Sequence, residues 1–146
     1  MAKLIRALRR SDDGAELIEM AIVLPLLLLL FFGMVDFGFM FQRYVVLTNA
    51  AAEGARVASL PGYTTADVIA RVNAYAVDGG IPGPVTTTRV AVALPGGAGG
   101  GTWPGSQVTV THVYNFQYIG PILTIFGRAT PGSVTMTSRA TMRHQI

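Results

Sequence analysis

The side chains that could perform chemistry are few in this sequence and widely spaced. Of the 146 residues none is cysteine, two are histidine (His112 and His144), and the one lysine is Lys3. The lack of cysteine excludes thiol nucleophiles, disulfides and Cys-ligated zinc. There is no Gly-x-Ser-x-Gly nucleophile motif, and the position of the lysine leaves no P-loop.

A metal site or an acid–base pair would need distant residues to meet in the fold. A site built on both histidines would also require Asp67 or Asp78 as a third ligand. No pairing of carboxylates suited to acid–base catalysis is visible. We interpret His112 as a sheet residue and His144 as a solvated residue of the tail. We expect a protein that is not an enzyme, with no metal and no cofactor.

One pair of residues near the N-terminus has a spacing with chemical meaning. Gly14 lies five positions before Glu19, and an apolar run follows Glu19 directly. Glycine lets the backbone extend into a protease cleft, and cleavage after Gly14 would leave a new ammonium group on Ala15. A carboxylate at the membrane boundary is costly to bury unless it is paired. Alternatively, Glu19 is an interfacial acid favoured by the helix macrodipole.

The element that carries Glu19 is predicted to be a membrane-spanning helix. No charge interrupts residues 20–35, and beyond Asp36 the apolar run continues to Met40. About 21 helical residues span roughly 31 Å, close to the hydrocarbon thickness of a bilayer. We therefore place a transmembrane span at about residues 20–41. The alternative is a buried helix of a soluble protein.

The charges that flank this run set its orientation. The only dense basic group precedes it, which predicts an N-in, C-out single pass with residues 1–14 as a cytoplasmic leader. A secretory signal peptide is disfavoured, because no small-x-small cleavage site follows the run and acids lie between the basic group and the leucines. The basic residues are Lys3, Arg6, Arg9 and Arg10, and the acids are Asp12, Asp13, Glu16 and Glu19.

The composition agrees with a membrane protein rather than a polyanion-binding one. The chain is 51% hydrophobic and 13% charged, with a mean hydropathy of +0.46. A typical soluble domain carries nearly twice that charge. The formal net charge is only +3. The arginines that follow the N-terminal basic group are scattered along the chain and form no cluster. We expect no nucleic-acid partner.

The helix is predicted to continue outside the membrane, so that one long helix covers residues 15–60. Small and apolar side chains recur there at steps of three or four, at Tyr44, Leu47, Ala51, Ala55 and Ala58. Glu53 and Arg56 form an i, i+3 pair on the polar side. After Pro61-Gly62 a shorter helix is capped by Thr64 or Thr65 and ends at Gly79-Gly80.

From Val85 onwards the hydrophobic period becomes two. Three segments alternate β-branched residues with threonine and other polar residues, around Val90–Leu94, Val108–Tyr118 and Val134–Met142. They predict an antiparallel sheet with one solvated face and one face packed on the alanine-rich helix. The fold class is an α+β membrane protein with a pilin-like layout. Residues 61–146 form an extracytoplasmic α+β domain.

Several positions have more than one interpretation. Residues 95–106 are predicted to be a loop without regular structure, in which Trp103 anchors the loop or contacts a partner. Residues 119–127 are too short for a second span and fill the core or form a patch for a partner subunit. Asp36 is an intramembrane charge that pairs with Arg43, pairs with a basic residue of a partner, or is hydrated at the membrane boundary.

The segment from Gly14 to Ser59 resembles the N-terminal half of TadE-like proteins, pseudopilins of tight-adherence (Flp) pilus systems. Met20 and Asp36 stand where family members commonly have an aromatic residue and a glutamate. The ending Ala-Thr-Met-Arg at 140–143 also fits. The matching features are the Gly14-to-Glu19 spacing, Leu24-Pro25, the patch Gly33…Asp36-Phe37-Gly38, and Thr48-Asn49-Ala50-Ala51…Glu53-Gly54-Ala55-Arg56.

The resemblance implies a minor pilin or pseudopilin of a type IV-like pilus, with a structural role in assembly and adhesion. A prepilin peptidase would recognise Glu19 and Met20 and cut between Gly14 and Ala15, and Glu19 would then meet the N-terminal amine of a neighbouring subunit. The implied partners are that peptidase, other pilin subunits, an inner-membrane assembly platform and the lipid bilayer. The implied location is the bacterial inner membrane, with incorporation into an extracellular pilus. The alternative is an uncleaved single-pass anchor that presents a binding module.

Overall fold

The structure is a computed structural model that describes residues 12–96, 102–125, 127 and 132–144, so most of the predicted leader lies outside the described residues. Contacts divide the chain into two compact units. One unit joins the chain up to Phe37 with Phe116–Gly132, and the other joins Gly38–Asn115 with Ser133–Ile146. Phe116–Gly132, which the sequence placed in the outer domain, thus groups with the N-terminal part of the long helix.

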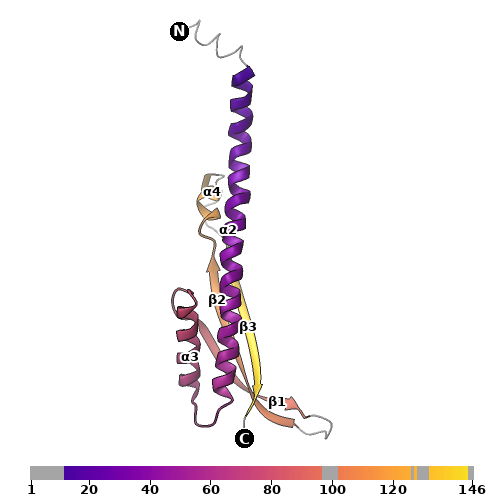
Figure 1. Cartoon of the computed structure of the whole chain (residues 1–146), viewed down its shortest axis with the longest axis vertical. Helices are drawn as coiled ribbons and strands as arrows, with labels where there is room; N and C mark the ends of the chain where they lie inside the picture. The colour runs from indigo at the N-terminus through magenta and orange to yellow at the C-terminus, as the bar shows by residue number, and fades with distance from the viewer. Residues whose placement is uncertain (1–11, 97–101, 126, 128–131, 145–146) are drawn as a thin grey trace. The chain divides into compact units, whose positions relative to one another are not determined.

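The long helix α2 covers Asp12–Ala58 and runs through both units (Figure 1). Leucine favours helix formation, and Pro25 lies inside the helix without ending it. Among the described residues, one helix is long and apolar enough to cross a membrane, and only 6% of its most apolar window is buried. A buried core helix of a soluble protein does not fit this exposure. One exposed apolar helix near the N-terminus is consistent with a single-pass anchor.

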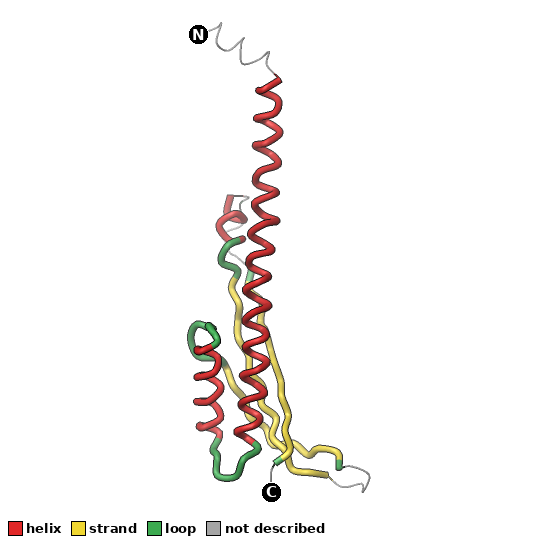
Figure 2. The backbone as a smooth tube through the Cα atoms, viewed as in Figure 1, coloured by secondary structure: helices red, strands yellow, loops and turns green. Residues whose placement is uncertain are grey.

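The second unit packs the C-terminal part of α2 against helix α3 (Thr65–Asp78) and the sheet (Figure 2). Thr64 caps α3, as predicted, and forms a capping box with Asp67. The buried side chains of α3 share one face. Gly54 permits the close approach, because a Cβ there would lie 2.5 Å from Val72 of α3 and 3.1 Å from Val108. The core side chains include Leu47, Ala50, Ala51, Ala55, Val68, Val72, Ala76, Val108, Val110 and Tyr114.

The sheet is antiparallel with strand order β1-β2-β3, formed by β1 (Thr86–Pro95), β2 (Thr102–Asn115) and β3 (Ser133–Arg143). Directly paired residues share a face, and Val108 pairs with Arg89 and Ala140. The buried face therefore carries Arg89, whereas Val90 is 49% exposed. The three strands and their pairing match the sequence prediction, but the hydrophobic valines of β1 lie on the opposite face from those of β2.

The prediction that residues 95–106 lack regular structure is wrong at both ends. Thr102 pairs with Pro95, and Trp103 pairs with Leu94, so strand pairing extends into the glycine-rich segment. Residues 97–101 lie outside the described residues. At the other end of β2 the strand stops at Asn115, and the alternation of Phe116 and Tyr118 therefore does not continue it.

Candidate functional site

The predicted processing segment occupies the first turns of α2. Gly14 is half-buried, and Ala15, Glu19 and Met20 are exposed. Among the described residues, Glu19 has no hydrogen bond or ion pair, so its carboxylate is available to another molecule. A protease must unwind the helix before it cuts, and the first turn is the easiest to unwind because its N–H groups have no partner within the helix.

Asp36 is held in a different way from any that the sequence suggested. Its side chain is fully buried, which excludes hydration at the membrane boundary. The carboxylate accepts hydrogen bonds from the backbone N–H groups of Gln117 (3.1 Å), Tyr118 (3.0 Å) and Ile119 (2.7 Å). These groups lead into the short helix α4, Ile119–Ile125, which lies beside α2 (Figure 1). Asp36 therefore caps α4 from another helix, and the unpartnered amides and the buried charge satisfy each other.

A groove of about 430 Å³ lies next to this cap. Phe37 and Phe116 meet edge to face across it, with ring centroids 5.9 Å apart. Ile119 of α4 lies next to Gly33, since its Cδ1 atom would be 3.7 Å from a Cβ at this position, an ordinary van der Waals distance. The lining residues are Gly33, Asp36, Phe37, Phe116, Ile119, Leu123 and Gly132. Apart from Asp36, these side chains are apolar or absent.

In the second unit, Arg43 lies over the ring of Tyr114, with 5.0 Å between the guanidinium carbon and the ring centroid. This cation–π contact gives the arginine a partner that the sequence analysis did not foresee. His112 lies on strand β2, as predicted, and close enough to Arg43 to be influenced by its charge. Burial lowers the pKa of His112, and the positive charge of Arg43 lowers it further. Its Nε2 atom is buried, and no hydrogen-bond partner for it exists in the described part of the chain.

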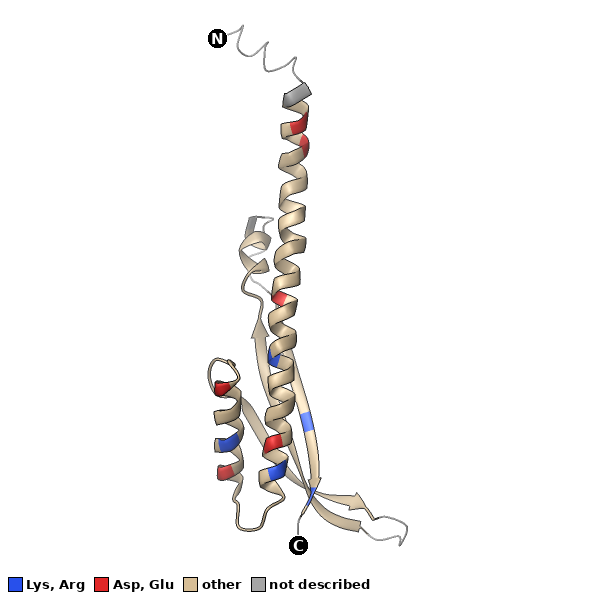
Figure 3. Ribbon diagram, viewed as in Figure 1, with Lys and Arg blue, Asp and Glu red and all other residues tan. Residues whose placement is uncertain are grey.

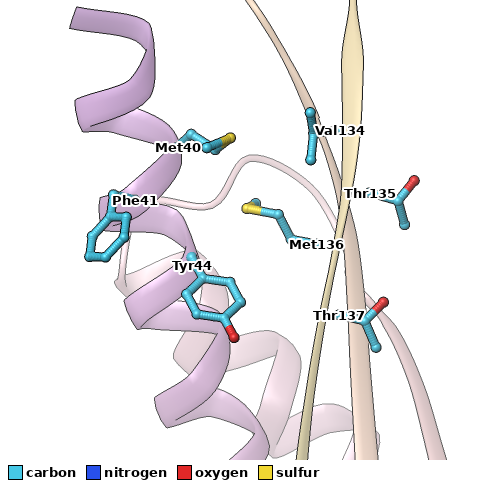
Figure 4. A pocket seen from close by; sticks show the side chains of 7 residues that line it. All are labelled: Met40, Phe41, Tyr44, Val134, Thr135, Met136 and Thr137. Carbon is cyan, nitrogen blue, oxygen red and sulfur yellow. The ribbon is translucent and has the colours of Figure 1, made fainter. Parts of the chain in front are cut away.

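A second apolar groove, of about 320 Å³, lies between α2 and β3 (Figure 4). Met40 and Met136 point toward each other across it, whereas Thr135 and Thr137 point away. Tyr44 closes the groove on the helix side. The lining is largely apolar and contains no Asp, Glu, His, Lys or Arg side chain, which suits an apolar partner.

The C-terminal end of α2 is capped by side chains of the sheet. Arg89 donates to the carbonyl oxygen of Ala58 (2.9 Å) and to that of Tyr63 (3.2 Å). A cation at this end is favourable because the last carbonyls of a helix carry partial negative charge. Ser106 lies 2.8 Å from Nε2 of His144. The prediction that His144 is a solvated tail residue is therefore wrong, since the tail is held along β2.

Trp103 is part of strand β2, not of a loop, and is 39% exposed. The guanidinium carbon of Arg143 lies 4.5 Å from the centroid of its ring. This contact joins the start of β2 to the end of β3.

Few charges lie on α2 between its first turns and its C-terminal part (Figure 3). Within the described residues, no group of three or more His, Asp or Glu side chains could hold a metal ion. Residues 14–56 match the family model described as TadE-like protein. This match confirms the resemblance predicted for the Gly14-to-Ser59 segment. No curated protein and no solved structure matches the chain.

Proposed function

We propose that this chain, whose residues 14–56 match the TadE-like family model, is a minor pilin-like subunit of a tight-adherence (Flp) pilus that is cleaved after Gly14. The match supports a pilus-associated, pilin-like protein, because the TadE-like family is structural rather than enzymatic. The observation that carries the finer proposal is the Gly14-to-Glu19 spacing in the first turns of α2, directly before the exposed apolar run of the same helix.

The chemistry of processing follows from the position of that segment. A membrane aspartyl peptidase on the cytoplasmic face hydrolyses the Gly14–Ala15 bond, which removes the basic leader and leaves an ammonium group on Ala15. Glu19 has no partner among the described residues. In the assembled pilus its carboxylate pairs with the ammonium of a neighbouring subunit, because a charge that enters an apolar helix bundle must be compensated. This pairing sets the axial position of each subunit.

The span supports retention in the inner membrane before assembly. About 20 apolar residues are enough to cross a bilayer, and the apolar side chains of α2 before Phe37 are largely exposed. The basic leader favours an N-in, C-out orientation. An inner-membrane assembly platform then moves subunits out of the bilayer, where they pack with other pilin subunits. The outer domain serves adhesion. Arg43 and Trp103 are the residues we propose for contacts with partners.

The experiment that tests the proposal is the intact mass and N-terminal residue of the protein from its native membrane. The same preparation from cells that lack the prepilin peptidase is the control. We expect a mature chain that starts at Ala15 only where the peptidase is present. A chain that retains Lys3 to Arg10 in both preparations would instead show a permanent single-pass anchor, and the function would then lie in the outer domain.

A further inference from the structure

We propose that α4, together with Tyr118 before it, is a second membrane-contacting element, which lies in the outer leaflet beside the transmembrane part of α2. Lipid acyl chains then fill the groove between the two helices. The inference rests on the membrane anchor in the proposed function, and not on cleavage or on the pilus. It assigns a role to Asp36 that the anchor alone does not explain.

The depth of α4 follows from the residue that holds it. Asp36 lies 16 residues after Met20, where the uncharged run begins. At 1.5 Å per residue, it is about 24 Å along a helix that crosses roughly 30 Å of hydrocarbon. Three hydrogen bonds join Asp36 to the residues that begin α4. The start of α4 is therefore fixed at the outer part of the span.

The chemistry of the segment suits that depth. No charged residue occurs from Phe116 to Gly127. Tyr118 and Pro121 are exposed, and Ile122 and Leu123 are half-buried. A seven-residue helix is too short to cross a bilayer. The absence of charge suits the apolar part of the outer leaflet, and Tyr118 suits its boundary because tyrosine concentrates at the membrane interface.

The backbone geometry gives an independent reason. In hydrocarbon every polar backbone group needs a partner within the protein, so irregular backbone is tolerated there only where it is internally satisfied. The N–H groups of Gln117 and Tyr118 precede the helix and both donate to Asp36. A buried carboxylate in a membrane carries a large cost unless hydrogen bonds compensate it. The three hydrogen bonds to Asp36 remove both the cost of unpaired N–H groups and the cost of the buried carboxylate. Outside the membrane, water could satisfy these groups instead.

The groove next to Asp36 continues the lipid-facing surface of α2. Phe37 lines the groove and is 58% exposed, and Met34 in the preceding turn is 65% exposed. Both belong to the apolar stretch that contacts the bilayer. An opening at this level of a membrane-spanning helix meets acyl chains first, and its largely apolar lining matches them.

The test uses fluorescent probes on single cysteines, because the chain contains no cysteine of its own. Pro121→Cys and Thr124→Cys report on α4, Leu28→Cys on the span, and Thr88→Cys on an exposed position of β1. The full-length protein is placed at high dilution in phosphatidylethanolamine–phosphatidylglycerol vesicles that contain nitroxide-labelled lipids. We expect several-fold stronger lipid quenching at positions 121 and 124 than at 88. Quenching at 121 and 124 should be strongest with a nitroxide in the outer part of the acyl chain, and at 28 with a nitroxide deep in the acyl chain.

The reference positions separate the ways in which the proposal can fail. If probes at 121 and 124 behave like the one at 88 while 28 is quenched, α4 is outside the bilayer and only this inference falls. If 28 is also unquenched, the membrane anchor itself is wrong. Protection of 124 from aqueous iodide without lipid quenching would show a protein cover, such as a second copy, and would also overturn the inference.

Asp36→Ala in the Thr124→Cys background tests the tether. We expect lipid quenching at 124 to fall several-fold, with Asp36→Asn in between because its amide oxygen still accepts hydrogen bonds. The Thr88 probe and the far-ultraviolet circular dichroism should stay unchanged, which shows that the remaining fold is intact. Undiminished quenching in Asp36→Ala would show that Asp36 does not hold α4 in the membrane.

Discussion

The carboxylate of Asp36 accepts a hydrogen bond from the backbone N–H of Ile119 at 2.7 Å, across 83 positions of sequence. One charged side chain thus fixes where the chain returns to the long helix after strand β2. Since a carboxylate bonded to several N–H groups is a strong and directional acceptor, this contact defines the unit that contains α4.

Loss of that carboxylate should release α4 from α2. In Asp36→Ala three N–H groups lose their acceptor, at a cost of about 2–4 kcal/mol in local stability. Hydrogen exchange of the amides of Gln117, Tyr118 and Ile119 in lipid nanodiscs should accelerate accordingly. Glu16→Ala, which removes an exposed acid near the start of the same helix, is the control and should leave these amides protected. Equal exchange in both variants would contradict the capping role.

The position of Asp36 shows what sequence analysis can and cannot provide. Its acceptor role depends on backbone N–H groups, which every residue except proline has, so no residue type at 117–119 signals it. The pair with Arg43 was suggested by their spacing on one helix, but the arginine has a partner in Tyr114 on the sheet. Local signals, in contrast, were sufficient for α3, because its capping box and its glycine ends lie within the segment itself.

The strands show the same distinction. Alternation predicted three strands, but register decides which face is buried, and register depends on partners far away in sequence. Arg89 is turned inward because the C-terminal carbonyl groups of α2 lie there. The glycine-rich composition of 95–106 predicted a loop, yet pairing with Leu94 and Pro95 supplies the hydrogen bonds that make Thr102 and Trp103 a strand.

The close contact at Gly54 predicts a size limit at this position. In Gly54→Ala the new Cβ would meet Val72 and Val108, and we expect a loss of about 1–3 kcal/mol in the free energy of unfolding from overpacking. Gly38→Ala is the matched control, because nothing lies within 4 Å of a Cβ at Gly38. Removal of a helical glycine there should stabilise the protein by about 0.5–1 kcal/mol. Thermal unfolding in one detergent compares the two, and a stable Gly54→Ala would refute the packing.

Glu53 links the polar sides of α2 and α3 and should make stability depend on acid. Hydrogen bonds from Arg56 and Arg71 lower the pKa of Glu53 to about 2. A carboxyl whose pKa is lower in the folded state stabilises the fold above its unfolded pKa of 4.5. That contribution is lost as the pH falls from about 4.5 toward 2, and it is below about 1 kcal/mol per pair since both arginines are exposed. In Glu53→Gln the free energy of unfolding should depend less on pH in this window, whereas Asp78→Asn should leave that dependence unchanged.

His112 should make the free energy of unfolding depend on pH in a higher range than Glu53 does. Because burial lowers its pKa, the unfolded chain binds the proton more tightly, and stability is lost as the pH falls below about 6.5. His112→Leu removes this dependence. It also removes an Nε2 atom that has no hydrogen-bond partner among the described residues, so we expect a gain of about 1 kcal/mol near pH 6. Unfolding of both proteins between pH 5 and 8 measures this, and a parallel pH dependence would exclude His112 as its source.

Glu19 should be needed for assembly after cleavage has taken place. In Glu19→Gln the side chain keeps its size and loses its charge, so it no longer compensates the ammonium of Ala15 on a neighbouring subunit. We expect a cleaved subunit that accumulates in the membrane and is depleted several-fold in the sheared pilus fraction, as measured by quantitative immunoblotting. Glu16→Gln is the matched control, because Glu16 is an exposed acid one turn earlier on the same helix. If both variants reach the pilus fraction equally, Glu19 does not set the position of the subunit.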